Sequence, residues 1–175
     1  IDEVLGGAKA ITEMGAVHRS LPACPQMHGT GMWIGTMVAL NCGGTVITQR
    51  TQHLDADALL QCVVDNEVTD LTIVGDAFAR PILAALDAAK GAGKPYDLSR
   101  VGQIASSGVM WSKKSKTRFL EHKKLTLLDT LGSSESPGQG SQLTKGDAGQ
   151  AKTATFELGD TTCLLYTSDA ADDWS

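Results

Sequence analysis

The sequence predicts an α/β fold in which alternating β-α units build a mostly parallel sheet flanked by helices. Segments with apolar side chains at helical spacing alternate along the chain with short runs rich in apolar and β-branched residues. These runs are apolar almost throughout, as parallel strands covered on both faces usually are. Alternation of this kind implies parallel strands joined by right-handed crossovers. With 175 residues, the chain is long enough for one domain with a hydrophobic core.

The first elements are expected to be a helix, a strand and a second helix. Residues 31 to 42 are apolar and uncharged, which predicts a buried helix, and the run GTVITQ at 44 to 49 predicts a strand. Residues 55 to 67 carry apolar side chains at helical spacing, and Asp55 is suited to cap the start of that helix. The Gly43-Gly44 pair interrupts the uncharged stretch, so we do not expect it to span a membrane.

The middle of the chain continues the alternation of strands and helices. Ser112 is a plausible cap for the last of these helices, and Gly91 and Gly93 are suited to end the one before it. The expected elements are a strand at 69–75, a helix at 77–93, a strand at 101–108, a helix at 112–122 and a strand at 125–132.

Beyond the last of these strands the sequence changes character. Residues 136 to 152 are rich in glycine, serine and glutamine without periodicity, which predicts a loop, and KTATFELG at 152 to 159 predicts a strand of a second sheet. The ending CLLYTSDAADDWS resembles a translated sequencing adapter, so we expect residues 161 to 175 to be non-native and 1 to 160 to form the domain fragment. Because the pattern starts abruptly at Ile1, we expect a piece of a longer protein.

The charge balance argues against a nucleic-acid partner. The net charge is -5, and the dense basic stretch KKSKTR at 113 to 118 is expected to be a solvated helix face. The sequence contains no positively charged segment followed by a short apolar core, so we do not expect a signal peptide. The cysteines are scattered without paired spacing, which indicates reduced thiols in a cytoplasmic protein. His18, Cys24 and His28 lie close in sequence, but their spacing does not favour zinc.

Two strand ends carry residues suited to a nucleotide. They are ASSGVMW at 105 to 111 and TLGSSES at 130 to 136, and the carboxyl ends of parallel strands are where ligands bind. Glycine allows close approach, serine hydroxyls and free N–H groups can bind phosphate oxygens, and the carboxylate of Glu135 suits Mg²⁺. Spacing alone favours the interpretation that the second segment is only a turn.

A third feature is PQMHGTG at 25 to 31, which precedes the first expected helix. His28 could face a pocket, act on a substrate or cap the helix. An apolar cluster surrounds this helix; core packing is the favoured role, although a long-chain substrate tunnel would use the same residue types. The cluster consists of Met27, Met32, Trp33 and Met37.

Taken in order, PQMHGTG, IASSGVMWS and DTLGSSES resemble the motif series of the adenylate-forming acyl-CoA synthetases, also called AMP-binding enzymes. More narrowly, the chain is similar to the actinobacterial fatty-acyl and steroid side-chain CoA ligases, over residues 1 to about 160. The resemblance implies a part of the large N-terminal domain of such an enzyme. It also implies ATP, Mg²⁺ and coenzyme A as reactants or cofactors, and a long-chain or steroid carboxylic acid as the substrate.

The resemblance assigns roles on the nucleotide side. Ser107, Gly108 and Val109 match the stretch that lines one face of the adenine. Asp129 matches a position, usually asparagine, that contacts the adenine amino group. Leu131 stands where the family has an aromatic residue, so apolar contact replaces stacking.

The resemblance also assigns roles near the reacting groups. His28 matches the histidine beside the acyl and adenylate site. Gly132, Ser133, Ser134 and Glu135 match the Gly-x-Thr-Glu part of the family motif. Ser134 keeps the hydroxyl near the α-phosphate, and Glu135 takes the Mg²⁺ carboxylate position.

Three function hypotheses follow from the sequence. The favoured one is a fragment of a ligase that forms an acyl-adenylate and then an acyl-CoA thioester. The family's phosphate loop, ribose motif and lid lysine fall outside the 175 residues, so the isolated chain is expected to be inactive. The alternatives are a free-standing flavodoxin-like nucleotide-binding module without catalysis, and a structural α/β domain whose glycine turns are only turns.

Overall fold

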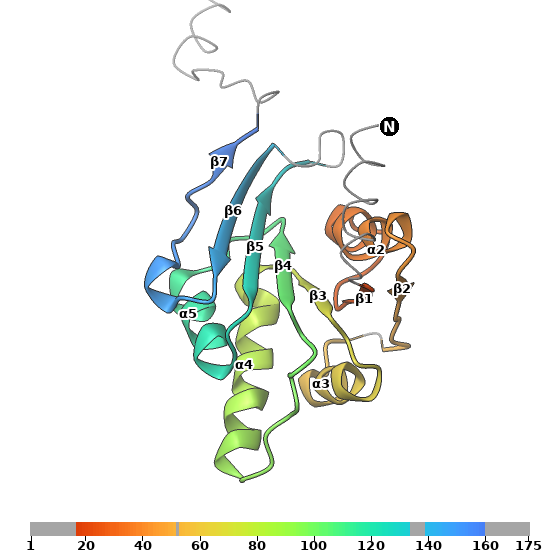
Figure 1. Ribbon diagram of the computed structural model, residues 1–175, viewed down its shortest axis with the longest axis vertical. Coiled ribbons are helices and arrows are strands. Elements are labelled where there is room, and N and C mark those ends of the chain that lie inside the picture. The colour runs from red at the N-terminus through yellow and green to blue at the C-terminus, as the bar shows by residue number, and fades with distance from the viewer. Residues whose placement is uncertain (1–16, 52, 134–138, 160–175) are drawn as a thin grey trace, which may run out of the picture.

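The computed structural model describes residues 17–51, 53–133 and 139–159, which contain a seven-stranded sheet in the order β2-β1-β3-β4-β5-β6-β7 (Figure 1). The predicted Ser134 and Glu135, and the tail at 161–175, lie outside the described residues. The strands are β1 Arg19–Pro22, β2 Thr45–Val46, β3 Asp70–Ile73, β4 Gln103–Ser107, β5 Thr126–Leu131, β6 Gly140–Lys145 and β7 Glu157–Leu158. The helices are η1 Thr30–Met37, α2 Val38–Asn41, α3 Ala56–Asp65, α4 Gly75–Gly91, α5 Lys113–His122 and η2 Ala148–Gln150.

The predicted α/β fold with a mostly parallel sheet is confirmed. Strands β1 to β5 pair in parallel, and β6 and β7 extend the sheet in antiparallel pairing. Strand β1 lies between β2 and β3, so the chain first moves to one side of β1 and then crosses to the other. This order is the flavodoxin-like one, in which the carboxyl ends beside the reversal form a natural ligand-binding crevice.

Helices cover both faces of the sheet. Helices α3, α4 and α5 pack side by side and share one hydrophobic core with the strands, while η1 contacts β1, β3 and β4 (Figure 1). The core consists of apolar side chains at helical spacing on the three helices and of the inward residues of the strands. Its fully buried members include Leu21, Leu59, Ile73, Ala79, Ile82 and Leu83.

Helix η1 approaches the sheet through small residues, which corrects the predicted packing of its methionines and tryptophan. Thr30, Gly31 and Gly35 are its buried residues, and a Cβ on Gly35 would lie 2.7 Å from the Cβ of Pro22. The side chains of Met32 and Trp33 therefore turn away from the sheet and are exposed, whereas Met37 is half-buried. Met27, which precedes η1, is 87% exposed. The first half of the predicted helix is a π-helix, which continues into the short α2.

Several element boundaries follow local capping chemistry. The Asp55 carboxylate accepts a hydrogen bond from the Ala58 N–H at 3.0 Å, and the Ser112 hydroxyl accepts one from the Ser115 N–H, so both predicted caps are confirmed. The predicted strand at 44–49 is shorter, because only Thr45–Val46 pairs with β1. None of the described helices is both long and apolar enough to cross a bilayer.

Two predictions for the residues beyond β5 are wrong, and strand β1 near the start of the chain was not predicted. The predicted loop at 136–152 contains β6. The buried positions of β6 are Gly140, Gln142 and Thr144, which are not apolar side chains. The strand therefore shows no alternation of apolar and polar residues by which the sequence could identify it. Strand β7 pairs with β6 in the same sheet and not in a second one. Strand β1 is too short and too polar at its start to stand out as an apolar run.

We predict that the shared core carries most of the stability of the domain. Leu83→Ala removes a fully buried side chain of α4 and should lower the free energy of unfolding by about 2–5 kcal/mol. The matched control is Leu143→Ala on β6, where the side chain is 51% exposed. Urea denaturation followed by circular dichroism measures both, and equal losses would contradict this assignment of the core.

Candidate functional site

The structure brings the predicted motifs to one edge of the sheet. Strands β1, β3, β4 and β5 are parallel neighbours, so the loops that follow them leave the sheet at the same edge. Ser106 pairs with Asp129 and Ser107 with Thr130, which aligns the two predicted nucleotide segments. The loop after β1 carries the PQMHGTG motif to the same edge.

His28 lies directly against the predicted adenine segment. A Cβ built on Gly108 would lie 3.3 Å from His28 Cε1 and 3.5 Å from Thr30 Oγ1, and Gly108 has a φ of +86°. A larger residue there would be strained and would press on the imidazole. The Thr30 N–H donates to His28 Nδ1 at 3.3 Å, so the neutral ring carries its proton on Nε2. His28 is exposed and can offer that N–H to a ligand at the edge.

The start of α4 supports the loop after β4 from below. The Gly75 N–H donates to Ser106 Oγ at 2.9 Å, and the Asp76 N–H donates to the Met110 carbonyl at 3.1 Å. A Cβ on Gly75 would lie 2.6 Å from the carbonyl oxygens of both Val109 and Met110, and the Gly75 φ of +50° also favours glycine. Gly75 is therefore a point of close approach between the backbone of α4 and that of the loop after β4.

Asp76 fixes the other end of the same loop. Its carboxylate accepts hydrogen bonds from the backbone N–H and the hydroxyl of Ser112, both at 3.1 Å, and from Arg80 at 3.1 Å. Burial raises the pKa of the Asp76 carboxyl, but the hydrogen bonds from Ser112, Ser115 and Arg80 outweigh burial and hold that pKa below its ordinary value. The carboxylate is thus a charged anchor for the residues between Gly108 and α5.

The surface between the two strand ends is largely apolar. Val109, Met110 and Leu131 are exposed, and Gly132 and Ser133 follow Leu131 on the outside. Flat apolar contact with a base fits such a surface, while the exposed glycines leave room for phosphate groups. Ser107, by contrast, is almost buried at the end of β4.

Asp129 is buried and already has a partner. Its carboxylate lies 2.6 Å from Lys116 Nζ, and both side chains are almost completely shielded from solvent. Burial raises the pKa of the Asp129 carboxyl, and the nearby ammonium of Lys116 opposes this shift. A contact of this side chain with an adenine amino group stays a prediction, and it would have to coexist with the bond to Lys116.

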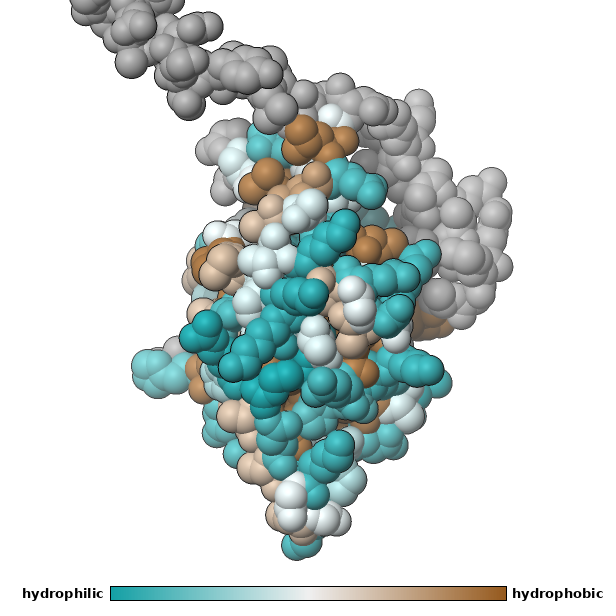
Figure 2. Space-filling model, turned by 90° about the vertical axis from the view of Figure 1, so that its left-hand side faces the viewer, coloured by the Kyte–Doolittle hydropathy of each residue, from teal (hydrophilic) through white to brown (hydrophobic). Residues whose placement is uncertain are grey.

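The burial of Lys116 corrects part of the predicted solvated face at 113 to 118. Hydrophilic residues do cover most of the face that carries α5 and β7 (Figure 2), and Lys113 and Lys114 are exposed. Lys116 instead lies on the inward side of α5, next to the buried Ser115 and one turn before Phe119. Lys116 precedes the buried Phe119 and Leu120 by three and four residues, so helical spacing places it on the same inward face.

Sequence reasoning also missed Gly75, Asp76 and Thr30. Gly75 ends the apolar run of β3 in the same way that Gly108 ends that of β4, so the neighbouring strand end was the available signal. Across the described ranges, no group of at least three histidine, cysteine or acidic side chains could hold a metal ion.

Sequence comparison finds relatives among curated CoA ligases. The chain is 40% identical over 116 residues to the medium/long-chain-fatty-acid–CoA/3-oxocholest-4-en-26-oate–CoA ligase of Mycolicibacterium smegmatis, covering 66% of this chain and 20% of that protein. It is 32% identical over 161 residues to the medium-chain acyl-CoA ligase Mig of Mycobacterium avium, covering 91% and 27%. It is 36% identical over 117 residues to the 3-oxocholest-4-en-26-oate–CoA ligase of Rhodococcus rhodochrous, covering 66% and 20%. The chain thus spans between 20% and 27% of the length of these relatives. No family model matches it.

Solved structures share the fold. The adenylation domain of a keto acid-selecting NRPS module, bound to keto acyl adenylate, matches with a TM-score of 0.61 at 20% identity, covering 83% of this chain and 29% of that one. The N-terminal domain of FACL13 from Mycobacterium tuberculosis matches with a TM-score of 0.58 at 16% identity, covering 75% and 32%.

We predict that Gly75 is required for the close approach beneath the loop after β4. Gly75→Ala should destabilise the domain by more than Gly93→Ala, because both positions have positive φ but only Gly75 has backbone oxygens where the Cβ would lie. The control should cost about 1–2 kcal/mol from the left-handed conformation alone. Urea denaturation measures both losses, and an equal cost at the two positions would refute the steric role.

The anchoring role of Asp76 predicts a pH dependence. Because its pKa is lower in the folded chain than in the unfolded one, its contribution is fully present above about pH 4 and is lost as the pH falls through the folded value. Asp76→Asn should therefore be less stable than the parent at pH 7, and the difference should narrow on acidification. Asp65→Asn on α3 is the control, since Asp65 is exposed and accepts a hydrogen bond from Gln61 of its own helix. A difference that is independent of pH would contradict the anchor.

Proposed function

This chain is homologous to a segment of the fatty-acyl and steroid side-chain CoA ligases, which belong to the adenylate-forming enzymes, and from that premise we propose that it supplies the nucleotide-facing edge of such a ligase. The whole enzyme would activate a carboxylic acid with ATP to an acyl-adenylate, release pyrophosphate, and transfer the acyl group to the thiol of coenzyme A. The observation that carries the proposal is the convergence of the loops after β1, β4 and β5 at one edge of the sheet.

The adenine would lie against the exposed strand ends. In this proposal Ser107, Gly108 and Val109 line one face of the base, and Leu131 contacts it through apolar surface. The left-handed backbone at Gly108 supports this role because it exposes the main chain without a side chain in the way. Asp129 would orient the end of β5 while bonded to Lys116, close to the adenine amino group.

The phosphate groups would lie over the residues that follow β5. Gly132 and Ser133 are exposed there, and Ser134 is proposed to donate its hydroxyl to the α-phosphate. Glu135 is proposed as the carboxylate ligand of Mg²⁺, an ion that is usually held by one or two carboxylates together with substrate phosphates. When bound, the ion would neutralise charge on the phosphates.

The acyl group would be on the His28 side of the edge. The His28 ring lies where a Cβ on Gly108 would meet it, so an Nε2–H donor lies next to the proposed adenylate position and could hold a carboxylate oxygen there. Met27, Met32 and Trp33 are exposed nearby on the motif and on η1. This apolar surface supports a fatty or steroid side-chain acid, the substrate classes that the names of the relatives carry.

A cytoplasmic location is part of the proposal. Within the described residues, Cys24 and Cys62 are free thiols, as is usual in a reducing compartment. Burial raises the pKa of the Cys24 thiol to about 11, so it is not a reactive thiolate at neutral pH. The sulfur chemistry of the proposed reaction therefore belongs to coenzyme A.

The second candidate is a free-standing nucleotide-binding module. The strand order of β1 to β5, which is that of flavodoxin-like folds, favours it. It predicts that the isolated chain binds an adenine nucleotide tightly, and that the protein encoded by the surrounding gene forms no acyl-CoA. Isothermal titration of the chain with AMP, and an acyl-CoA assay of the full gene product, separate the two candidates.

We predict that the 175-residue chain alone releases no pyrophosphate from ATP with a long-chain fatty acid and coenzyme A, whereas the full gene product does.

In the full protein, Glu135→Gln should lower kcat/KM by about 100-fold or more, because a charge that stabilises the transferring group is removed. Glu157→Gln on the exposed β7 is the matched control. Pyrophosphate release by the pure chain would contradict its inactivity. A full protein without acid-dependent pyrophosphate release would contradict the ligase function.

A further inference from the structure

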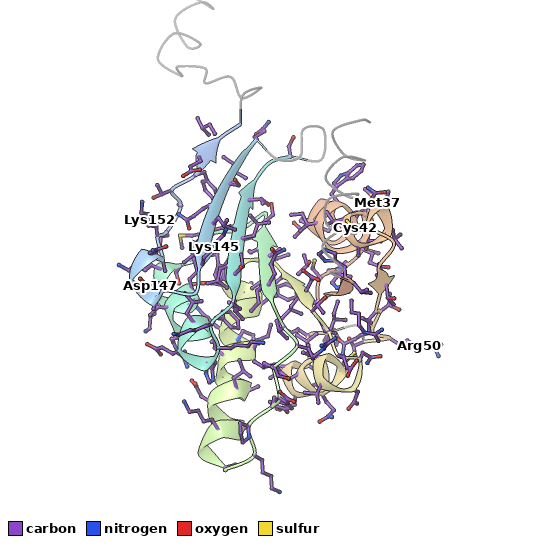
Figure 3. All side chains as sticks on the ribbon, viewed as in Figure 1. Met37, Cys42, Arg50, Lys145, Asp147 and Lys152 are labelled. Carbon is purple, nitrogen blue, oxygen red and sulfur yellow. The ribbon has the colours of Figure 1, made fainter. Side chains whose placement is uncertain are left out.

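The Lys116 side chain, including its ammonium group, is buried. It lies on α5, is 1% exposed, and directs its ammonium group away from solvent. Nζ lies 2.6 Å from Asp129 Oδ2, 2.5 Å from Gln142 Oε1 and 3.1 Å from the carbonyl oxygen of Lys152. An ammonium group has three donors, and these contacts use all of them. Lys152 lies on the connection between η2 and β7, beside the sheet (Figure 3).

The main partner of Lys116, Asp129, belongs to a strand that ends at the proposed nucleotide edge. Asp129 is on β5, shortly before Gly132, and it pairs in register with Ser106 of β4 and Gln142 of β6. The Lys116 ammonium also lies 5.3 Å from the centre of the Trp111 ring, and Trp111 closes the loop after β4. One ammonium group therefore connects both strand ends that the proposed function assigns to the nucleotide.

The network extends beyond the lysine to the antiparallel part of the sheet. The amide of Gln142 donates to the carbonyl of Thr155 at 2.6 Å while its oxygen accepts from Lys116. The Lys113 N–H donates to Thr153 Oγ1, which ties the start of α5 to the same segment. Strand β6 and the residues before β7 thus act as the outer support of the end of β5.

A contribution to the stability of the fold does not by itself explain the buried ion pair of Lys116 and Asp129. Removing two charges from water is costly, and well-packed apolar side chains of similar size often stabilise a core as well as a buried ion pair does. Such pairs instead restrict the structure to one arrangement, because every other arrangement leaves a buried charge without a partner. The arrangement restricted here is the relative position of the β4 loop and the end of β5.

We propose that Lys116 is a positioning residue for the nucleotide site, which holds the loop after β4 and the end of β5 in their binding geometry through Trp111 and Asp129. The proposal rests on the proposed function, since it assigns the nucleotide to that edge. Lys116 itself is enclosed, so it acts through its partners. Its loss should weaken the use of ATP more than the use of the carboxylic acid.

The first test uses the chain itself and does not depend on catalysis. Lys116→Met should increase hydrogen exchange at Thr130 and Leu131 and in residues 109–111, while exchange in β3 stays unchanged. Lys114→Met is the matched control on the exposed side of the same helix. Because Lys116→Met leaves Asp129 buried and unpaired, Lys116→Met/Asp129→Asn is measured beside it to recover a folded domain. Unchanged exchange at both strand ends in either folded variant would overturn the proposal.

The second test measures kinetics in the full gene product. Lys116→Met/Asp129→Asn should raise KM for ATP by about tenfold or more, since small displacements of a binding group have large effects, and leave KM for the fatty acid nearly unchanged. Asp129→Asn alone is the reference. A KM for ATP equal to that of the reference would show that the lysine only neutralises Asp129, and would overturn the proposal. If the parent protein forms no acyl-CoA, the ligase function fails, and the exchange test alone decides the role of Lys116.

Discussion

The parallel pairing of β1, β3, β4 and β5 is the constraint on which the rest of the molecule depends. The loops that follow parallel strands leave the sheet at the same edge. The strand pairing itself therefore brings segments that are far apart in sequence close together. The register of Ser106 with Asp129 fixes how far the two loops extend relative to one another. The apolar core beneath α3, α4 and α5 keeps this register, because a slip by one residue would turn every inward side chain outward.

Glycines decide how closely the edge can be built. Gly35 lets η1 lie against β1, Gly75 lets the start of α4 lie under the loop after β4, and Gly108 lets that loop lie against His28. In each case a Cβ would meet a neighbouring atom at 3.3 Å or less, so the backbone itself forms the contact surface. Main-chain groups approach a ligand closely under the same condition, which links the packing of the edge to its proposed use.

The sequence predicted the features that local chemistry determines. Apolar periodicity located α3, α4 and α5, and side-chain capping located the starts at Asp55 and Ser112. The three motifs follow strands that leave the sheet at one edge, and the use of that edge stays a prediction. It did not predict β6, because Gln142 and Thr144 face inward only where Lys116 and the neighbouring strand give them partners. The outward turn of Met32 and Trp33 also depends on tertiary packing, since glycines take the inner face of η1. The proposed roles of Ser134 and Glu135 remain predictions from the sequence.

Two buried carboxylates, Asp76 and Asp129, stabilise the edge by different means. Asp76 accepts several hydrogen bonds and keeps its charge easily, which is why its pKa falls despite burial. Asp129 depends mainly on one ammonium group, so burial prevails and raises its pKa. A carboxylate with many donors tolerates the loss of one, whereas a carboxylate with a single cation does not. The end of β5 is therefore the more sensitive of the two supports, and its geometry depends on Lys116, on a helix that does not itself reach the proposed site.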